Sequence, residues 1–197
     1  YARRFEVELD PGSELLPVLG SKEAVPRLPL ALLDPGGVAL CPDPGYPVYV
    51  SATILAGADA VPLPLRPDHG FSPDLAAIPS DVLGRARLLW LNYPNNPTGA
   101  VAPPGLLEEA VALCREHSIV LVHDAPYTEI SEPGYRAPSV LQVPGAREVA
   151  VDHQTLHPVK LGSWLYQGHA RPAAFQKQPP AGLREAGVYG YIRSPRV

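Results

Sequence analysis

The residues best suited to chemistry lie in the segment Asn92–Gly99, which reads Asn-Tyr-Pro-Asn-Asn-Pro-Thr-Gly. It follows the apolar run Leu88–Leu91, which predicts a buried strand that ends at this cluster of turn residues. Two prolines in four residues exclude a strand or a helix and stiffen the backbone. We therefore expect the amides of Asn95 and Asn96 to be held at the carboxyl end of a strand, where open α/β sheets bind ligands. For this segment alone, a plain turn is the alternative.

A second segment, Gly20–Glu23, reads Gly-Ser-Lys-Glu and lies where a predicted strand hands over to a predicted helix. Free backbone N–H groups and the helix dipole make such a position an anion site. Ser21 adds a hydroxyl donor and Lys22 a positive charge. Many helices begin with Gly-Ser, so ordinary helix capping is an equally good interpretation of this segment alone.

Two more segments carry groups that bind ligands. In Asp43–Tyr49, the ring of Tyr46 is held between a glycine and a proline, which indicates a stacking surface or, alternatively, a core tyrosine. In His123–Tyr127, Asp124 follows an apolar predicted strand, and a carboxylate there is costly to bury without a partner. Asp124 thus indicates a ligand-binding carboxylate, with a helix cap as the structural alternative. His123 is assigned only to packing near the site.

These four motifs, in this order and spacing, resemble the class I/II aminotransferases, which are pyridoxal-phosphate enzymes of fold type I. The closest resemblance is to the branch of LL-diaminopimelate and aspartate aminotransferases, and it covers about residues 1–151. It implies cofactor contacts of four kinds: the phosphate, the pyridine face, the protonated ring nitrogen and the 3-hydroxyl. The residues at these positions are, in that order, Ser21 with Lys22, Tyr46, Asp124, and Asn96 with Tyr127.

The resemblance implies transfer of an amino group from an amino acid to a 2-oxo acid, through a lysine that forms a Schiff base with pyridoxal 5′-phosphate. Pro158 falls where the family carries this lysine, and Lys160 lacks its small hydroxyl neighbours. The catalytic residues therefore stay unassigned. One alternative is a catalytically inactive, truncated chain that at most binds the cofactor non-covalently. Another is a carbon–sulfur lyase of the same fold.

The composition is that of a globular protein and excludes several other classes. The 197 residues are 46% hydrophobic and 18% charged, which excludes a disordered chain. A net charge of -4 gives no basis for binding nucleic acid or an anionic membrane. Cys41 and Cys114 have no metal-binding or redox spacing, so we expect no metal site and two free thiols in a reducing cytoplasm.

Two features of the chain predict a partial enzyme. It opens without Met at what resembles the middle of a helix, and family members run about twice its length, so we expect a fragment. The resemblance implies that the parent enzyme is a homodimer, because this fold builds its sites at a subunit interface. Residues 1–151 carry 10 basic and 18 acidic residues, a balance of -8, whereas residues 152–197 carry 6 and 2, a balance of +4. We interpret residues 1–151 as a partial pyridoxal-phosphate-binding large domain. Residues 152–197 form an unassigned tail, with a shift of reading frame near residue 151 as the simplest hypothesis.

Apolar periodicity predicts strands that alternate with helices. Strands are expected at residues 14–19, 38–41, 60–63, 87–91 and 119–122, and helices at 1–7, up to 33, 48–58, 73–78 and 104–117. Pro29 is expected to kink the second helix or cut it short. The alternation predicts an α/β fold of three layers, in which helices cover both faces of a mostly parallel sheet.

Overall fold

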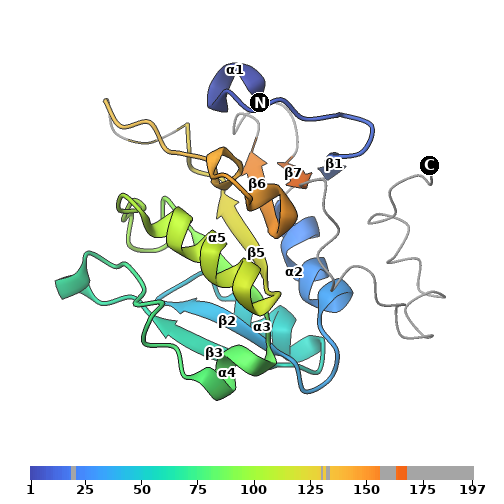
Figure 1. The fold of residues 1–197 in the computed structure, drawn as a ribbon, viewed down its shortest axis with the longest axis vertical. Coiled ribbons are helices and arrows are strands. Elements are labelled where there is room, and N and C mark those ends of the chain that lie inside the picture. The colour runs from blue at the N-terminus through green and yellow to red at the C-terminus, as the bar shows by residue number, and fades with distance from the viewer. Residues whose placement is uncertain (19–20, 130, 132–133, 156–162, 168–197) are drawn as a thin grey trace.

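The computed structural model describes residues 1–18, 21–129, 131, 134–155 and 163–167, and of residues 21, 22, 155 and 163–167 the backbone alone. Seven strands form one sheet in the order β1-β7-β6-β5-β4-β2-β3 (Figure 1). Five neighbours, from β6 to β3, pair in parallel, while β7 is antiparallel to both β6 and β1. The strands are β1 (Leu15–Val18), β2 (Val38–Asp43), β3 (Asp59–Pro64), β4 (Ala86–Asn92), β5 (Val120–Ala125), β6 (Ala150–Thr155) and β7 (Ser163–Gln167).

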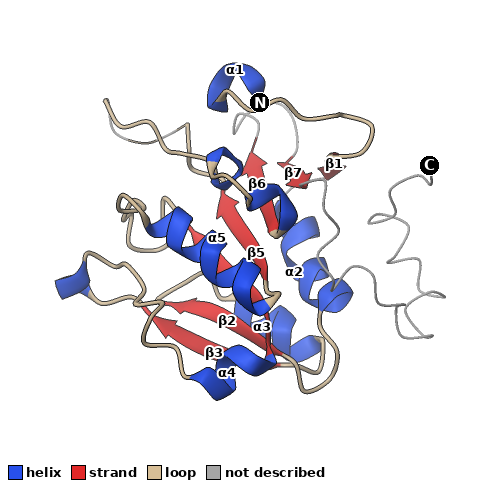
Figure 2. Cartoon of the chain, viewed as in Figure 1, coloured by secondary structure: helices blue, strands red, loops and turns tan. Residues whose placement is uncertain are grey.

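Helices cover both faces of this sheet, which confirms the predicted three-layer α/β fold (Figure 2). The helices are α1 (Ala2–Phe5), α2 (Ser21–Leu32), α3 (Val48–Leu55), α4 (Ser80–Arg85) and α5 (Leu106–His117), with short 3-10 helices η1 (Pro67–His69), η2 (Val140–Gln142) and η3 (Ala146–Glu148). The first core cluster joins one sheet face to α4, α5, η2 and η3. The second joins the other face to α2 and α3.

Strand β4 shows why the sheet sits between two helical layers. Its alternate side chains Leu89 and Leu91 belong to the first core cluster, whereas Leu88 and Trp90 belong to the second. All four are at most 1% exposed. Complete burial of such a side chain stabilises the fold by roughly 1.5–3 kcal/mol. An unbroken apolar run is therefore what a central parallel strand requires, because both of its faces are covered.

One local prediction is wrong and another is wrong in part. Residues 73–78 form bends and turns, and the helix of this region is α4, which begins at Ser80. With six residues, α4 is too short to give a clear helical period. Pro29 does not cut α2 short, since Leu33 N still donates to Pro29 O at 2.9 Å. The buried side chains Val25, Leu28 and Leu32 anchor α2 in the second core cluster, and this packing offsets the backbone bonds lost at its prolines.

Strand β6 crosses residue 151, where the sequence predicted the large domain to end, and β7 lies beyond it. The domain boundary and the shift of reading frame stay predictions. None of the described helices is both long and apolar enough to cross a membrane. The described part of the chain also contains no group of three or more His, Cys, Asp or Glu side chains placed to hold a metal ion.

Candidate active site

The loop Asn92–Gly99 is tied to the ends of two neighbouring strands. The Asn92 side chain is buried at the end of β4, and its Nδ2 donates to the backbone oxygen of Asp124 at 2.7 Å. Its Oδ1 accepts from the backbone N–H of Asn96 at 2.7 Å. Further along, Asn95 Oδ1 accepts from the backbone N–H of Thr98 at 3.2 Å and from its hydroxyl at 2.8 Å. The loop is therefore held at the carboxyl end of β4, as the sequence predicted.

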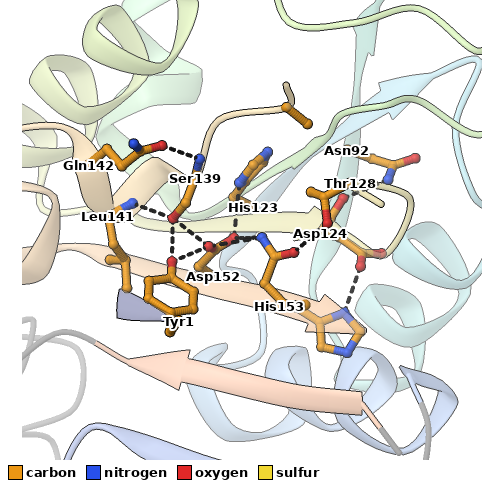
Figure 3. Close-up of polar contacts among 12 residues, drawn as sticks. Tyr1, Asn92, His123, Asp124, Thr128, Ser139, Leu141, Gln142, Asp152 and His153 are labelled. Carbon is orange, nitrogen blue, oxygen red and sulfur yellow. Dashed lines mark hydrogen bonds and ion pairs between the residues drawn. The ribbon is translucent and has the colours of Figure 1, made fainter. Parts of the chain in front are cut away.

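Asp124 lies near the end of β5 and is 4% exposed. Its two carboxylate oxygens have different partners. Oδ2 accepts from the Tyr49 hydroxyl at 2.5 Å. Oδ1 lies 2.6 Å from His153 Nδ1 (Figure 3). A carboxylate only accepts, so Nδ1 carries the hydrogen of this bond. Burial, followed by the nearby Asp124 charge, raises the pKa of Tyr49 well above its ordinary value, which keeps its hydroxyl a donor. Asp124 thus binds two side chains rather than capping a helix.

Three aromatic rings, those of Tyr46, Tyr49 and Trp90, contact one another beside this carboxylate. The Tyr49 ring stacks on Trp90, with centroids 4.5 Å apart and planes at 20°. Tyr46, which is half-buried, meets Tyr49 edge-on at 5.6 Å and 83°. The backbone before Tyr46 admits only glycine, because a Cβ on Gly45 would lie 2.2 Å from the carbonyl oxygen of Pro42. The close turn at Gly45 therefore fixes the position of the Tyr46 backbone, from which the ring projects.

Asn96 and Tyr127 meet across the ends of β4 and β5. Asn96 Nδ2 donates to the Tyr127 hydroxyl at 3.5 Å, a long bond that leaves both groups able to take another partner. Both side chains line a cavity of about 530 Å³, together with Ser131 and Tyr135. Two of the predicted site residues are thus brought together at the wall of a cavity of ligand-binding size.

The topology brings the segments that carry the other predicted site residues to the same edge of the sheet. Strands β5, β4 and β2 are neighbours and parallel, so the loops that carry Asp124, Asn96 and Tyr46 leave from one edge. Strand β1 runs in the same direction, because two successive antiparallel pairings relate it to β6. Helix α2, which begins at Ser21, therefore starts at this edge too. The side chains of Ser21 and Lys22, and the whole of Lys160, lie outside the described residues.

Sequence reasoning assigned no role to Asn92, Tyr49 or His153, which hold the loop and Asp124. The sequence did contain an indication for Tyr49. It stands three residues after Tyr46, and residues three apart lie on the same side of a helix. A signal also existed for His153. The pair Asp152-His153 interrupts a buried strand and reverses the order of His123-Asp124. Contact between the two pairs depends on the register of β5 and β6, which no local pattern contains.

His123 is packed as expected, at 1% exposure, but it lies on the opposite face of the sheet from the Asp124 carboxylate. Its Nδ1 is 3.0 Å from Asp152 Oδ1, and Asp152 also accepts from the hydroxyls of Ser139 and Tyr1 at 2.6 and 2.5 Å (Figure 3). Gln154 Nε2 donates to both Asp152 oxygens at 3.1 and 3.0 Å. Burial raises the pKa of Asp152, but these contacts, above all that of His123, outweigh burial and leave the pKa lowered.

Comparison with known proteins defines the class to which this geometry belongs. The sequence profile described as aminotransferase class I and II matches residues 1–153, and the chain belongs to this family. An LL-diaminopimelate aminotransferase of Desulforudis audaxviator is 51% identical over 165 residues, which cover 83% of this chain and 42% of the relative. An LL-diaminopimelate aminotransferase of Moorella thermoacetica is 48% identical, also over 165 residues that cover 83% of this chain and 42% of the relative. The chain thus spans about two fifths of these relatives.

Solved structures agree with this membership. The substrate-bound BacF structure from Bacillus subtilis matches with a TM-score of 0.83 and 31% identity, over 98% of this chain and 48% of that one. A probable N-succinyldiaminopimelate aminotransferase from Thermus thermophilus matches with a TM-score of 0.80 and 37% identity, over 98% of this chain and 50% of that one.

Class I and II aminotransferases use pyridoxal 5′-phosphate, and the described residues fit this group. A buried carboxylate suits a protonated pyridine nitrogen, and Asp124 lies at the edge of the sheet where ligands bind. Tyr46 offers an aromatic face and Asn96 with Tyr127 a pair of polar groups for a ring hydroxyl. The described residues therefore fit the group that this family uses.

Proposed function

We propose that this chain carries the cofactor half-site of an aminotransferase that moves an amino group between an amino acid and a 2-oxo acid. The observation that carries the proposal is the Asp124 carboxylate, which is 4% exposed and held by two donors at the carboxyl end of β5. A carboxylate so placed and oriented suits a cationic ring better than a structural role alone. Pyridoxal phosphate supplies an electron sink for carbanion chemistry when it is bound.

The proposed roles of the chain's own residues follow from their chemistry. Asp124 holds the proton at the pyridine nitrogen, because the carboxylate stabilises the positive charge there. Tyr46 covers one face of the ring, while Asn96 and Tyr127 bind its 3-hydroxyl oxygen. The first turn of α2, with Ser21 and Lys22, binds the phosphate through its backbone N–H groups and the helix dipole.

The lysine that holds the cofactor covalently is the open part of the proposal. The sequence contains three lysines, Lys22, Lys160 and Lys177, so a search for the Schiff base has three side-chain candidates. Lys160 is the first to examine, because it lies two residues after Pro158, which stands where the family carries this lysine. The alternative, an inactive chain that binds the cofactor non-covalently, draws support from Pro158, which stands where the family carries the lysine.

The experiment is a cofactor titration followed by a transfer assay on the full 197-residue chain. Pyridoxal 5′-phosphate is added, borohydride reduces any imine, and peptide mass spectrometry locates the adduct. LL-diaminopimelate is the first amino acid to try, because the relatives above are named for it, with 2-oxoglutarate as acceptor. Saturable binding, an adduct on one lysine and new glutamate support the proposal in full.

A matched pair of variants separates a specific site from casual lysine chemistry. Asp124→Asn removes the proposed charge, whereas Asp81→Asn removes an exposed charge on α4, at the amino end of β4. Loss of binding in the first and not the second supports the site. Saturable binding without transfer favours the inactive alternative. Equal binding by wild type and Asp124→Asn overturns the proposal.

Three finer points belong to the same proposal. The parent enzyme is proposed as a homodimer, and the side chains Val50, Ile54 and Leu55 of α3, which are 42%, 61% and 78% exposed, offer apolar surface for a partner.

A cytoplasmic location is proposed because Cys41 and Cys114 are free, buried thiols. Burial raises the pKa of Cys41 to about 11, which keeps that thiol protonated and unreactive.

A further inference from the structure

Strands β5 and β6 carry two histidine–aspartate pairs in crossed order. The backbone register sets His123 beside Asp152 and Asp124 beside His153. Because successive side chains of a strand point to opposite faces, the two pairs lie on opposite sides of the sheet. A slip of one residue would separate both pairs, so together they select this register.

The pair of Asp124 and His153 is buried on the face that carries the candidate site. The His153 side chain is 0% exposed, and its Nδ1 lies 2.6 Å from Asp124 Oδ1 (Figure 3). Within the described part of the chain, His153 Nε2 has no hydrogen-bond partner. Among the described residues, the imidazole of His153 therefore makes its only hydrogen bond to Asp124, through Nδ1.

A carboxylate that is held at one oxygen only can still turn about its Cβ–Cγ bond. The Tyr49 hydroxyl holds Oδ2 from α3, and His153 holds Oδ1 from β6. Two donors from two separate elements fix the plane of the group. Supporting bonds of this kind orient residues that contact a ligand and are needed for tight, directional recognition.

We propose that His153 is a positioning residue, which holds the Asp124 carboxylate in the plane that meets the ring nitrogen of the cofactor. The proposal rests on the proposed function, since it assumes that Asp124 contacts that nitrogen. A structural pair alone would stabilise the fold and leave recognition of the ring nitrogen unchanged. The two roles therefore differ in what a substitution at His153 does to ligand selectivity.

The test measures selectivity on the full chain with two ligands that form no imine with a lysine. One is pyridoxamine 5′-phosphate, and the other is its carbocyclic analogue, in which C–H replaces the ring nitrogen. The ratio of the two dissociation constants reports the contact between Asp124 and the ring nitrogen. Partial unfolding weakens both ligands by the same factor and cancels from the ratio. Equilibrium dialysis gives both constants.

Three variants complete the design. His153→Leu removes the donor at similar volume, His153→Asn keeps an N–H donor near the position of Nδ1, and His123→Leu breaks the twin pair on the other face. We expect wild type to prefer pyridoxamine phosphate by about 10- to 100-fold, as one charge-assisted bond provides. His153→Leu should reduce this preference about tenfold, whereas His153→Asn and His123→Leu should retain most of it.

Two results would overturn the assignment: an unchanged ratio in His153→Leu, or an equal loss in His123→Leu. Failure of the proposed function looks different. A wild-type chain that binds neither ligand, or binds both equally, contradicts the contact of Asp124 itself, and the role of His153 falls with it.

Discussion

Asp152 and Asp124 are two buried carboxylates on adjacent, paired strands, and they have opposite surroundings. Asp152 is 0% exposed and accepts from His123, Ser139, Tyr1 and Gln154. Asp124 is 4% exposed and accepts from His153 and Tyr49 only, among the described side chains. The first carboxylate is saturated with protein donors. The second keeps lone pairs for another partner.

The difference shows how one strand pair separates stability from recognition. A carboxylate has about four acceptor positions, so four donors leave Asp152 no capacity for a ligand. Two donors fix Asp124 and leave acceptor positions for a further partner. Because the two pairs face opposite sides of the sheet, each can be changed with little direct effect on the other.

The largest expected effect is on stability. Asp152→Asn removes the negative charge beside His123 and leaves one acceptor oxygen where the carboxylate offered two, so we expect the free energy of unfolding to fall by about 3–5 kcal/mol. Asp124→Asn should cost less than half of that, because only two protein donors face it. Urea unfolding followed by circular dichroism measures both. Equal losses would show that Asp124 is as structural as Asp152.

The next effect concerns recognition and reverses the order of the two residues. Asp124→Asn removes the charge proposed to meet the pyridine nitrogen, so the affinity for pyridoxamine 5′-phosphate should fall about 10- to 100-fold. The fraction of Asp152→Asn that remains folded should bind with near wild-type affinity. Dialysis in stabilising osmolyte keeps that variant folded for the comparison. A similar loss of affinity in the folded Asp152 variant would break the distinction between the two carboxylates.

A smaller effect on ligand affinity is expected from a substitution at Tyr49. Tyr49→Phe removes the hydroxyl that holds Asp124 Oδ2 and keeps the ring that stacks on Trp90. The loss of one hydrogen bond is worth about 1 kcal/mol, so affinity for the same ligand should fall about fivefold. The tryptophan emission of the free protein should stay unchanged, because the stacked ring remains. An unchanged affinity would mean that His153 alone positions the carboxylate.

The sequence predicted the layers of the fold better than the order of its strands. Apolar periodicity located β2, β4, β5 and α5, because each of these segments has a strong local pattern. The positions of β1 and β7 depend on pairing between segments more than 140 residues apart, as in Leu15 with Tyr166. Such pairing leaves no trace in a local window.

The candidate site shows the same division. Asp124, Asn96, Tyr46 and Tyr127 stand in motifs whose chemistry is visible in the sequence, and the structure brings Asn96 to Tyr127. The two side chains that hold Asp124 come from α3 and β6, and only the fold brings them to one carboxylate. His153 also lies just beyond residue 151, where the sequence analysis placed the end of the domain.

The last prediction concerns the pKa that distinguishes the saturated carboxylate. Burial alone raises the pKa of Asp152, whereas the bonds from His123, Ser139 and Tyr1 lower it, and the balance lies below the ordinary value of 3.8. A carboxyl group with a lowered folded pKa contributes stability in full above its unfolded value. That contribution is lost as the pH falls through the folded value, since the unfolded chain binds the proton more readily. The carbon-13 signal of the Asp152 carboxyl group should therefore titrate with a midpoint below 3.8, and urea unfolding should show stability falling from about pH 4 downward. A midpoint above 3.8 would mean that burial outweighs the four donors, and Asp152 would then lose the feature that sets it apart.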